Sequence, residues 1–113
     1  MHEAGLAQTA LEVAAERARE RGATRIHRLT LRVGDLSGVV VEALWFALEA
    51  LSPDTPAEGA AFEIEVVPVE CHCAACDHLF RPADVVYACP ECGAISGDVR
   101  RGHELELVSM DVT

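Results

Sequence analysis

The sequence predicts an α+β fold: a small three-stranded sheet with two helices, interrupted by an inserted cysteine-rich lobe. Two segments have the 3.6-residue periodicity of amphipathic helices, and three segments alternate apolar and polar residues as strands do. Four cysteines form two Cys-x-x-Cys pairs within one short segment. The chain has 113 residues, half of them hydrophobic, which suffices for one compact unit with a small appendage.

Two segments are expected to be helical, residues 4–21 and residues 40–51. In the first, charged residues cover one face, and an apolar stripe forms the other, made by Leu6, Ala10, Val13 and Ala14. Gly22 is a natural end for this helix. In the second helix, the large apolar residues are Leu44, Leu48 and Leu51 on one side, with Trp45 and Phe46 nearby. The proline-containing segment 52–56 ends it.

Three strands follow from alternating patterns. Their apolar members are Leu29, Leu31 and Val33 in the first strand, Phe62, Ile64 and Val66 in the second, and Leu105 and Leu107 in the third. Pro68 should end the second strand or place it at a sheet edge. The cysteine-rich segment lies between the second and third strands, so we expect these two strands to leave and re-enter the main domain side by side. The chain would then comprise an α/β domain, residues 1–70 and 101–113, and a lobe, residues 71–100.

The two cysteine pairs predict a metal site. Cys73, Cys76, Cys89 and Cys92 have the spacing that brings four thiolates to one tetrahedral ion. Pro90 presets φ in the second turn, and Gly93 can take the positive φ that follows it. A lobe of this size cannot bury a core alone, so its order should depend on the ion, and structural zinc contributes about 10–16 kcal/mol in comparable peptides.

The ligands alone do not distinguish zinc from iron, because rubredoxin-like iron sites also use Cys-Pro-x-Cys-Gly turns. Zinc is favoured because Phe80 and Tyr87 are the only aromatic residues of the lobe, and because only twelve residues separate Cys76 from Cys89. Four thiolates saturate a zinc ion, which makes the site structural and the lobe zinc-ribbon-like. A thioredoxin-like redox motif is disfavoured, since neither pair opens a helix after a strand.

Charge and hydropathy restrict the function classes. The net charge is −10, and all nine basic residues are arginine, which argues against nucleic-acid binding and favours cations or a basic protein surface as partners. The sequence shows no basic, apolar leader and no stretch near the ~18 apolar residues of a membrane span. We therefore expect a cytoplasmic protein that binds no membrane. Paired cysteines in that compartment bind metals more often than they form disulfides.

Met1, His2 and Glu3 form a second candidate metal site. Met1 should be retained, because aminopeptidases remove it only before a small residue. The Met1 amine, the His2 amide and the His2 imidazole can form fused chelate rings around Ni(II) or Cu(II), which favour planar nitrogen coordination, whereas zinc does not. Glu3 can add an oxygen or its amide nitrogen. Many chains begin with Met-His by chance, however, and N-termini are commonly disordered.

Other candidate residues receive simpler interpretations. Cys71 is expected to be a small buried residue, and His27, His72 and His78 are expected at the surface. His103 could approach the nickel site as an extra ligand, and the roles of Cys71 and His103 stay open. The sequence shows no nucleophile–base pair and no phosphate-binding loop, so we expect a protein that is not an enzyme.

One family combines these features in this order. The shared residues are Met1-His2-Glu3, Gly34, Leu36, Glu42, Leu44, Phe46, Glu58-Gly59-Ala60 and both cysteine pairs. On these residues the chain resembles the HypA/HybF family of nickel metallochaperones for [NiFe]-hydrogenase maturation. Val41 departs from the proline that members often carry before Glu42, a local difference at the start of a helix.

The resemblance implies nickel bound at His2 with the neighbouring main chain, and zinc on the four cysteines. It also implies two partners, a HypB-type GTPase and the [NiFe]-hydrogenase large-subunit precursor. A homodimer, the particular hydrogenase and a role in urease maturation stay open. Two other interpretations remain from the residues alone: a rubredoxin-like iron electron carrier, which would be red and loaded with iron, and a zinc-ribbon adaptor, which would show no nickel chemistry.

Overall fold

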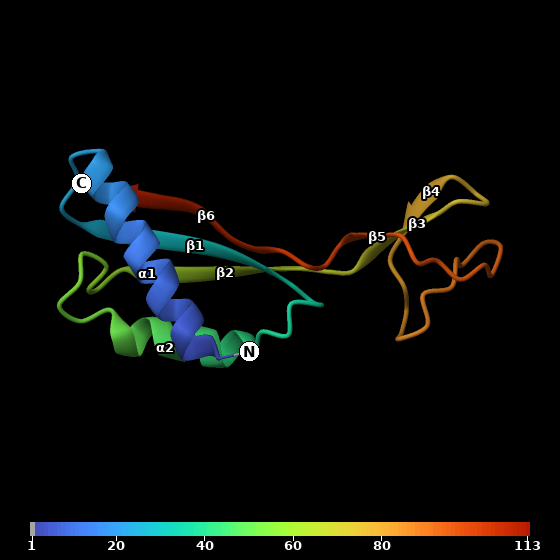
Figure 1. Cartoon of the computed structure of the whole chain (residues 1–113), viewed down its shortest axis with the longest axis horizontal. Coiled ribbons are helices and arrows are strands. Elements are labelled where there is room, and N and C mark those ends of the chain that lie inside the picture. Colours follow the sequence, from blue (N-terminus) through green and yellow to red (C-terminus); the bar gives the residue numbers. More distant parts are fainter. Residues whose placement is uncertain (1) are drawn as a thin grey trace.

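The computed structural model describes residues 2–113. The molecule is elongated, with principal extents of 53 × 26 × 17 Å. A body of two helices and a three-stranded sheet occupies one end, a small lobe occupies the other, and two linkers join them (Figure 1). No helix among the described residues is both long enough and apolar enough to cross a lipid bilayer.

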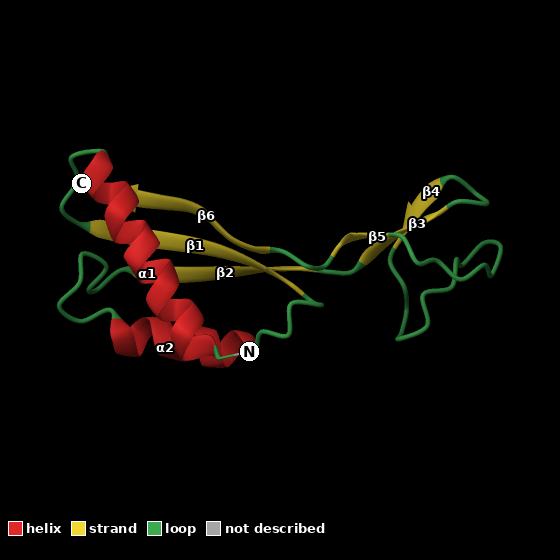
Figure 2. Ribbon diagram, in the orientation of Figure 1, coloured by secondary structure: helices red, strands yellow, loops and turns green. Residues whose placement is uncertain are grey.

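The elements follow the order expected from the sequence. The body contains α1 (Glu3–Glu20), β1 (Ile26–Gly34), α2 (Val41–Leu51), β2 (Ala61–Val67) and β6 (Leu105–Val112). The lobe contains three short strands that the sequence patterns did not predict: β3 (Glu70–Cys73), β4 (His78–Phe80) and β5 (Val99–Arg101). Figure 2 shows both helices on the body and only strands and loops in the lobe. The predicted α+β class is therefore confirmed.

The order of the body sheet differs from expectation. The strands lie in the order β2-β1-β6, with β1 parallel to β2 and antiparallel to β6. The prediction that the second and third strands lie side by side is therefore wrong, because β1 separates them. The physical reason is burial: β1 carries three large apolar side chains at the centre of the core (Leu29, Leu31 and Val33), whereas β2 and β6 are more exposed and suit the edges. Pro68 follows the end of β2, as predicted.

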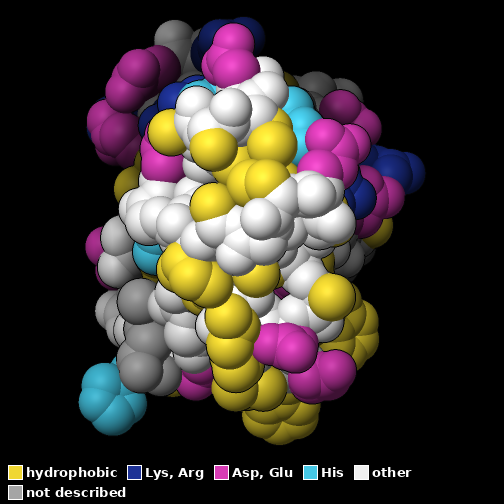
Figure 3. All heavy atoms as spheres, turned by 90° about the vertical axis from the view of Figure 1, so that its right-hand side faces the viewer, with side chains coloured by type: hydrophobic (Ala, Val, Ile, Leu, Met, Phe, Trp, Pro, Cys, Tyr) yellow, Lys and Arg dark blue, Asp and Glu magenta, His cyan; other side chains and the backbone are white. Residues whose placement is uncertain are grey.

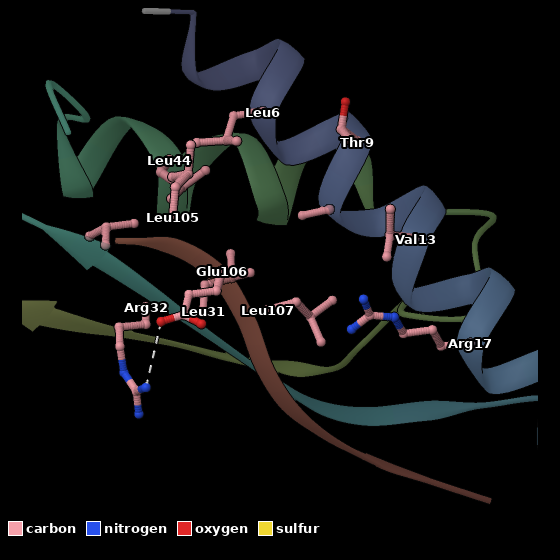
Figure 4. Close-up of a pocket in the computed structure, with 12 residues that line it drawn as sticks. Leu6, Thr9, Val13, Arg17, Leu31, Arg32, Leu44, Leu105, Glu106 and Leu107 are labelled. Carbon is pink, nitrogen blue, oxygen red and sulfur yellow. Dashed lines mark ion pairs between the residues drawn. The ribbon is translucent and has the colours of Figure 1, made fainter. Parts of the chain in front are cut away.

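Helix α1 uses a different face from the predicted one. Its buried side chains are small and recur with helical spacing: Ala7, Leu11, Ala14 and Ala18. Alanines at these positions let α1 approach its neighbours closely. The predicted stripe lies to one side of this buried face. Its residues Leu6 and Val13 line a groove of about 420 Å³ between α1 and the sheet (Figure 4). Of the predicted stripe only Ala14 is fully buried, and Val13 is exposed.

The sheet face opposite the helices is polar and carries cross-strand ion pairs. Arg28 of β1 contacts Glu63 of β2 and lies 3.5 Å from Asp111 of β6. Four residues further along β1, Arg32 lies 3.1 Å from Glu65 and 3.7 Å from Glu106. These pairs are partly exposed, so each contributes at most about 1 kcal/mol. They explain why arginine alternates with apolar residues in the central strand.

The return linker of the lobe crosses the end of β1 at two glycines. A Cβ atom on Gly34 would overlap the carbonyl group of Gly102, and Gly102 itself has φ +126°. The loop after β1 is hydrogen-bonded to both linkers: Asp35 N–H donates to Val67 O at 2.9 Å, and Leu36 N–H donates to Gly102 O at 2.7 Å. The absence of a side chain at position 34 thus lets the two linkers and the loop meet.

This crossing generates a stability prediction. Gly34→Ala should lower the free energy of unfolding by about 2–3 kcal/mol, because main-chain atoms must move to admit the methyl group. Gly5→Ala is the matched control, since a Cβ there meets open space on a helix, and it should raise stability by up to about 1 kcal/mol. Chemical denaturation of both variants measures the difference. Equal stabilities would contradict the close approach.

Candidate metal centres

The structure brings the four predicted cysteines together in the lobe. Their Sγ atoms all lie within 4.8 Å of one another, with 3.6 Å between Cys73 and Cys92 and 4.0 Å between Cys89 and Cys76. Zinc lies about 2.3 Å from each thiolate sulfur, which sets the sulfurs of a regular tetrahedron roughly 3.8 Å apart. The four sulfurs are therefore close enough to surround one tetrahedral ion.

The two Cys-x-x-Cys turns have the same local construction. Asp77 N–H donates to Cys73 O at 2.7 Å, and Gly93 N–H donates to Cys89 O at 2.8 Å. Asp77 and Gly93 both take positive φ, +52° and +77°, as the sequence predicted for Gly93. Aspartate is among the few non-glycine residues that adopt this conformation readily. Each turn thus closes on itself and points its two sulfurs inward.

Hydrogen bonds divide the thiols of this cluster into two kinds. The main-chain N–H of Cys92 points at Cys89 Sγ and, with the N–H of Glu91 and the His78 ring, lowers the pKa of Cys89 to about 6. The bond between Cys76 and Cys92 favours the protonated form of Cys76 and raises its pKa to about 12. A cation bound among the sulfurs would replace the protons that they share.

His78 lies against the cluster rather than at the open surface. Its Nε2 atom is 3.4 Å from Cys89 Sγ, and its Nδ1 atom is 3.4 Å from a carboxylate oxygen of Glu91. His72 is also partly buried, with Nε2 3.0 Å from Asp77 Oδ1. The prediction of surface positions for these two histidines is therefore wrong. The Cys-x-His spacing after the first cysteine pair was the available signal, because the turn folds His78 back toward the sulfurs.

Cys71 is not part of the sulfur cluster. Its side chain is fully buried and packs with Cys73, Phe80 and Cys89 in the core of the lobe. Burial raises the pKa of the Cys71 thiol. This confirms the expectation of a small buried residue. The lobe core is consequently built largely from cysteines, and three of these, Cys73, Cys76 and Cys89, also belong to the sulfur cluster.

The other candidate site lies at the start of α1, on the body. His2 is the residue before the first turn, its side chain is exposed, and its carbonyl accepts a 3.1 Å hydrogen bond from Leu6 N–H. Met1, the third predicted nickel ligand, lies outside the described residues. Glu3 Oε2 accepts a 3.0 Å hydrogen bond from Val40 N–H, which with the Glu3 main chain holds the pKa of this carboxyl below its usual range. Glu3 thus ties the start of α1 to the start of α2.

The two predicted metal sites lie in different parts of the molecule. Residues 2–113 contain one group of metal-type ligands, the four cysteines, and the start of α1 lies on the body away from it (Figure 1). His27 is exposed on β1 and bonds Thr113 Oγ1 at 2.8 Å, as a surface residue. His103 is also exposed, between β5 and β6.

Comparison with known proteins places this architecture in a family. Residues 1–112 match the family described as "Hydrogenase/urease nickel incorporation, metallochaperone, hypA". The chain belongs to the HypA family. Relatives include the hydrogenase maturation factors HypA of Picosynechococcus sp., 46% identical over 99% of each chain, and of Roseiflexus sp., 41% identical over 98% of this chain and 91% of that protein.

Solved HypA structures share the fold. The solution structure of the Ni metallochaperone HypA from Helicobacter pylori has a TM-score of 0.69, with 99% of this chain and 97% of that chain covered. A second solution structure of a HypA protein gives 0.74, with 100% and 97% covered. Both are 24% identical and support the fold alone. The predicted family is confirmed, and with it a metallochaperone for hydrogenase maturation rather than an enzyme.

The sulfur geometry generates a prediction on metal content. Cys92→Ser should lose about one metal ion per chain, because three thiolates and a hydroxyl bind a tetrahedral ion much more weakly. Cys71→Ala is the matched control and should retain the ion, since Cys71 lies outside the cluster. Elemental analysis of both purified variants measures zinc and iron together. Metal loss in Cys71→Ala with retention in Cys92→Ser would refute the assigned ligand set.

Proposed function

We propose that this HypA-family protein binds Ni(II) at its N-terminus and helps deliver it to the [NiFe]-hydrogenase large subunit during maturation. The proposed ligands are the Met1 α-amine, the His2 amide and imidazole nitrogens, and Glu3 through its amide nitrogen or a carboxylate oxygen. The observation that carries the proposal is the exposed His2 at the start of α1, in a chain whose family is described by nickel incorporation. A planar site of this kind leaves both faces of the ion uncovered, and a donor of an acceptor protein can approach the ion there.

The start of a helix suits main-chain coordination. The first four amides of an α-helix have no carbonyl partner within the helix, so the His2 and Glu3 nitrogens can bind a metal without loss of a helical hydrogen bond. The Leu6–His2 bond, which begins the helix, uses the carbonyl of His2 and is unaffected. The positive end of the helix dipole opposes a cation, however. Deprotonated amides and the Glu3 carboxylate supply the negative charge that offsets this effect.

Glu3 is proposed to act in two ways. One carboxylate oxygen accepts the Val40 N–H, which fixes the side chain beside the start of α2. The other oxygen or the amide nitrogen is proposed to complete the nickel site. The tether limits the freedom of the first residues, which lowers the entropy lost when the ligands order around the ion.

We propose that the four cysteines hold a structural Zn(II). Four thiolates at tetrahedral spacing suit zinc, and four protein ligands leave no position for a substrate. Bound zinc would offset half of the negative charge of the four thiolates and fix the two turns around which the lobe folds. The proposed division of the chain follows from this: residues 1–70 and 101–113 form the nickel-binding domain, and residues 71–100 form the zinc-binding domain.

The proposed partners are a HypB-type GTPase and the [NiFe]-hydrogenase large-subunit precursor. A protein that carries an ion must exchange it with other proteins, and the acidic surface of this chain favours basic partner surfaces. The site of action is proposed to be the cytoplasm. The iron-carrier and adaptor interpretations receive no support from any further observation.

A first prediction concerns His2. His2→Ala should weaken nickel binding by at least about a hundred-fold, because it removes the imidazole that closes the chelate rings. His27→Ala, which removes another exposed histidine from the body, is the matched control and should bind nickel normally. Calorimetric titration of untagged protein with Ni(II), alongside zinc analysis, measures both effects. Undiminished nickel affinity in His2→Ala would refute the proposed site.

A second prediction concerns the α-amine. A Gly-Ser extension before Met1 should also weaken nickel binding, because it converts the proposed amine ligand into an amide and displaces the end of the chain. The same extension placed after Thr113 is the control. Absorption spectra of the nickel complexes should show the planar-site band only in the control. Identical spectra for both proteins would exclude the amine as a ligand.

A further inference from the structure

An apolar groove lies beside the proposed nickel site. It has a volume of about 430 Å³ and runs between the first residues of α1 and one face of α2. His2 and Glu3 line one end, and the remaining wall is apolar. Phe46 stands at its edge with 70% of its surface exposed, and Leu51 is 40% exposed. An exposed phenylalanine of this kind has no role in the core of the body, whose buried α2 residues are Leu44, Ala47 and Leu48.

Helix α2 carries two apolar stripes, and only one of them faces the core. The outward stripe recurs at helical spacing and consists of Ala43, Phe46, Ala50 and Leu51, and the buried core residue Ala47 lies at its border with the inward stripe. Three alanines make a shallow floor, and the two larger side chains form walls. Small residues flanked by large ones at this spacing accept the side chains of a second helix. The face is thus shaped for another helix or a short apolar segment.

The charges around this groove have one sign. Glu42 and Glu49 each precede an alanine of the floor and flank the stripe, and Glu3 lies at its end. Between Arg32 and Arg81 the sequence contains acidic residues and no lysine or arginine. A second copy of this chain would bring the same acidic residues to the contact and repel. A segment with an apolar face flanked by Lys or Arg would be attracted.

We propose that this groove is the docking site for the protein that exchanges nickel with His2, and that the docked element is an amphipathic segment with a basic rim. The inference rests on the proposed nickel function, because the groove is assigned by its position next to His2. Phe46 is the anchor on this side of the contact. Docking here would bring the partner's ligands to an uncovered face of the planar nickel site, where exchange needs no movement of the lobe.

The test measures affinity for the two proposed partners, the HypB-type GTPase and the hydrogenase large-subunit precursor, each purified from the same organism. Phe46→Ala should weaken binding of at least one of them by about ten- to thirty-fold, the loss typical of a central aromatic anchor. Leu79→Ala is the matched control, since Leu79 is 52% exposed on β4 of the lobe, and should change affinity less than about two-fold. Ala50→Arg, which fills the groove and adds a positive charge, is a second disrupting variant.

A charge series tests the basic rim separately. Glu42→Gln with Glu49→Gln should weaken binding and flatten its dependence on salt, whereas Glu12→Gln with Glu20→Gln, exposed on α1, should do neither. Full affinity of Phe46→Ala and Ala50→Arg for both partners would overturn the proposal. The proposal would also be overturned if these variants lost only self-association, measured by sedimentation, because the groove would then bind a second copy of this chain. If the two double variants changed partner affinity and its salt dependence equally, the proposal that the partner segment has a basic rim would be overturned.

Nickel titrations keep this proposal distinct from the nickel function. Phe46→Ala should bind nickel as the unmodified chain does and fail only in association and transfer. His2→Ala should lose nickel and still bind the partner through the groove. Retained nickel affinity in His2→Ala would remove the proposed function, whereas retained partner affinity in Phe46→Ala would remove the docking site alone.

Discussion

The contact between Gly34 and Gly102 is the constraint on which the arrangement of this molecule depends. It lets the return linker of the lobe pass directly over the end of β1, where a side chain would block it. The loop after β1 then bonds both linkers through Asp35 and Leu36, and its far end donates from Val40 to Glu3. One short segment therefore fixes the exit of the lobe, the start of α2 and the first turn of α1 together.

The body and the lobe are stabilised by different physics. The body buries aliphatic side chains between two helices and one face of the sheet, so its core contributes in proportion to the apolar area removed from water. The lobe buries little besides cysteines, Phe80 and a few partly exposed neighbours. The proposed zinc ion would supply the remaining free energy of folding through its ligand bonds, as in small domains that fold only with their metal. A chelator should therefore unfold the lobe and leave the body folded. Figure 3 shows the lobe end-on, with apolar side chains at its surface.

Local patterns predicted the elements, and long-range contacts decided what the patterns could not. Periodicity placed both helices and the three body strands, and cysteine spacing identified the four cysteines whose sulfurs lie together. The predicted strand order was wrong because alternation of apolar and polar residues shows which face of a strand is buried but not which strand lies beside it. Nothing in the sequence pattern therefore marked β1 as the central strand. The predicted buried face of α1 was wrong because alanine and leucine occupy two adjacent stripes of this helix. Only the packing against the body decides that the stripe with Ala7 and Ala18 is the buried one. The contacts of Glu3 with Val40 and of His78 with Cys89 join distant or folded-back residues and carry little local signal.

The charge distribution links the two proposed activities of the body. An acidic surface attracts divalent cations and basic proteins alike, within about 8 Å at physiological salt. Because divalent cations carry the same charge, this attraction cannot select nickel among them. Selection must come from ligand geometry, and the start of a helix offers nitrogen donors in a row that suits planar coordination. The same acidic residues do select among protein surfaces, because like charges repel. Under the two proposals, the charged rim therefore selects the partner that approaches, while the first residues of α1 select the ion that is held.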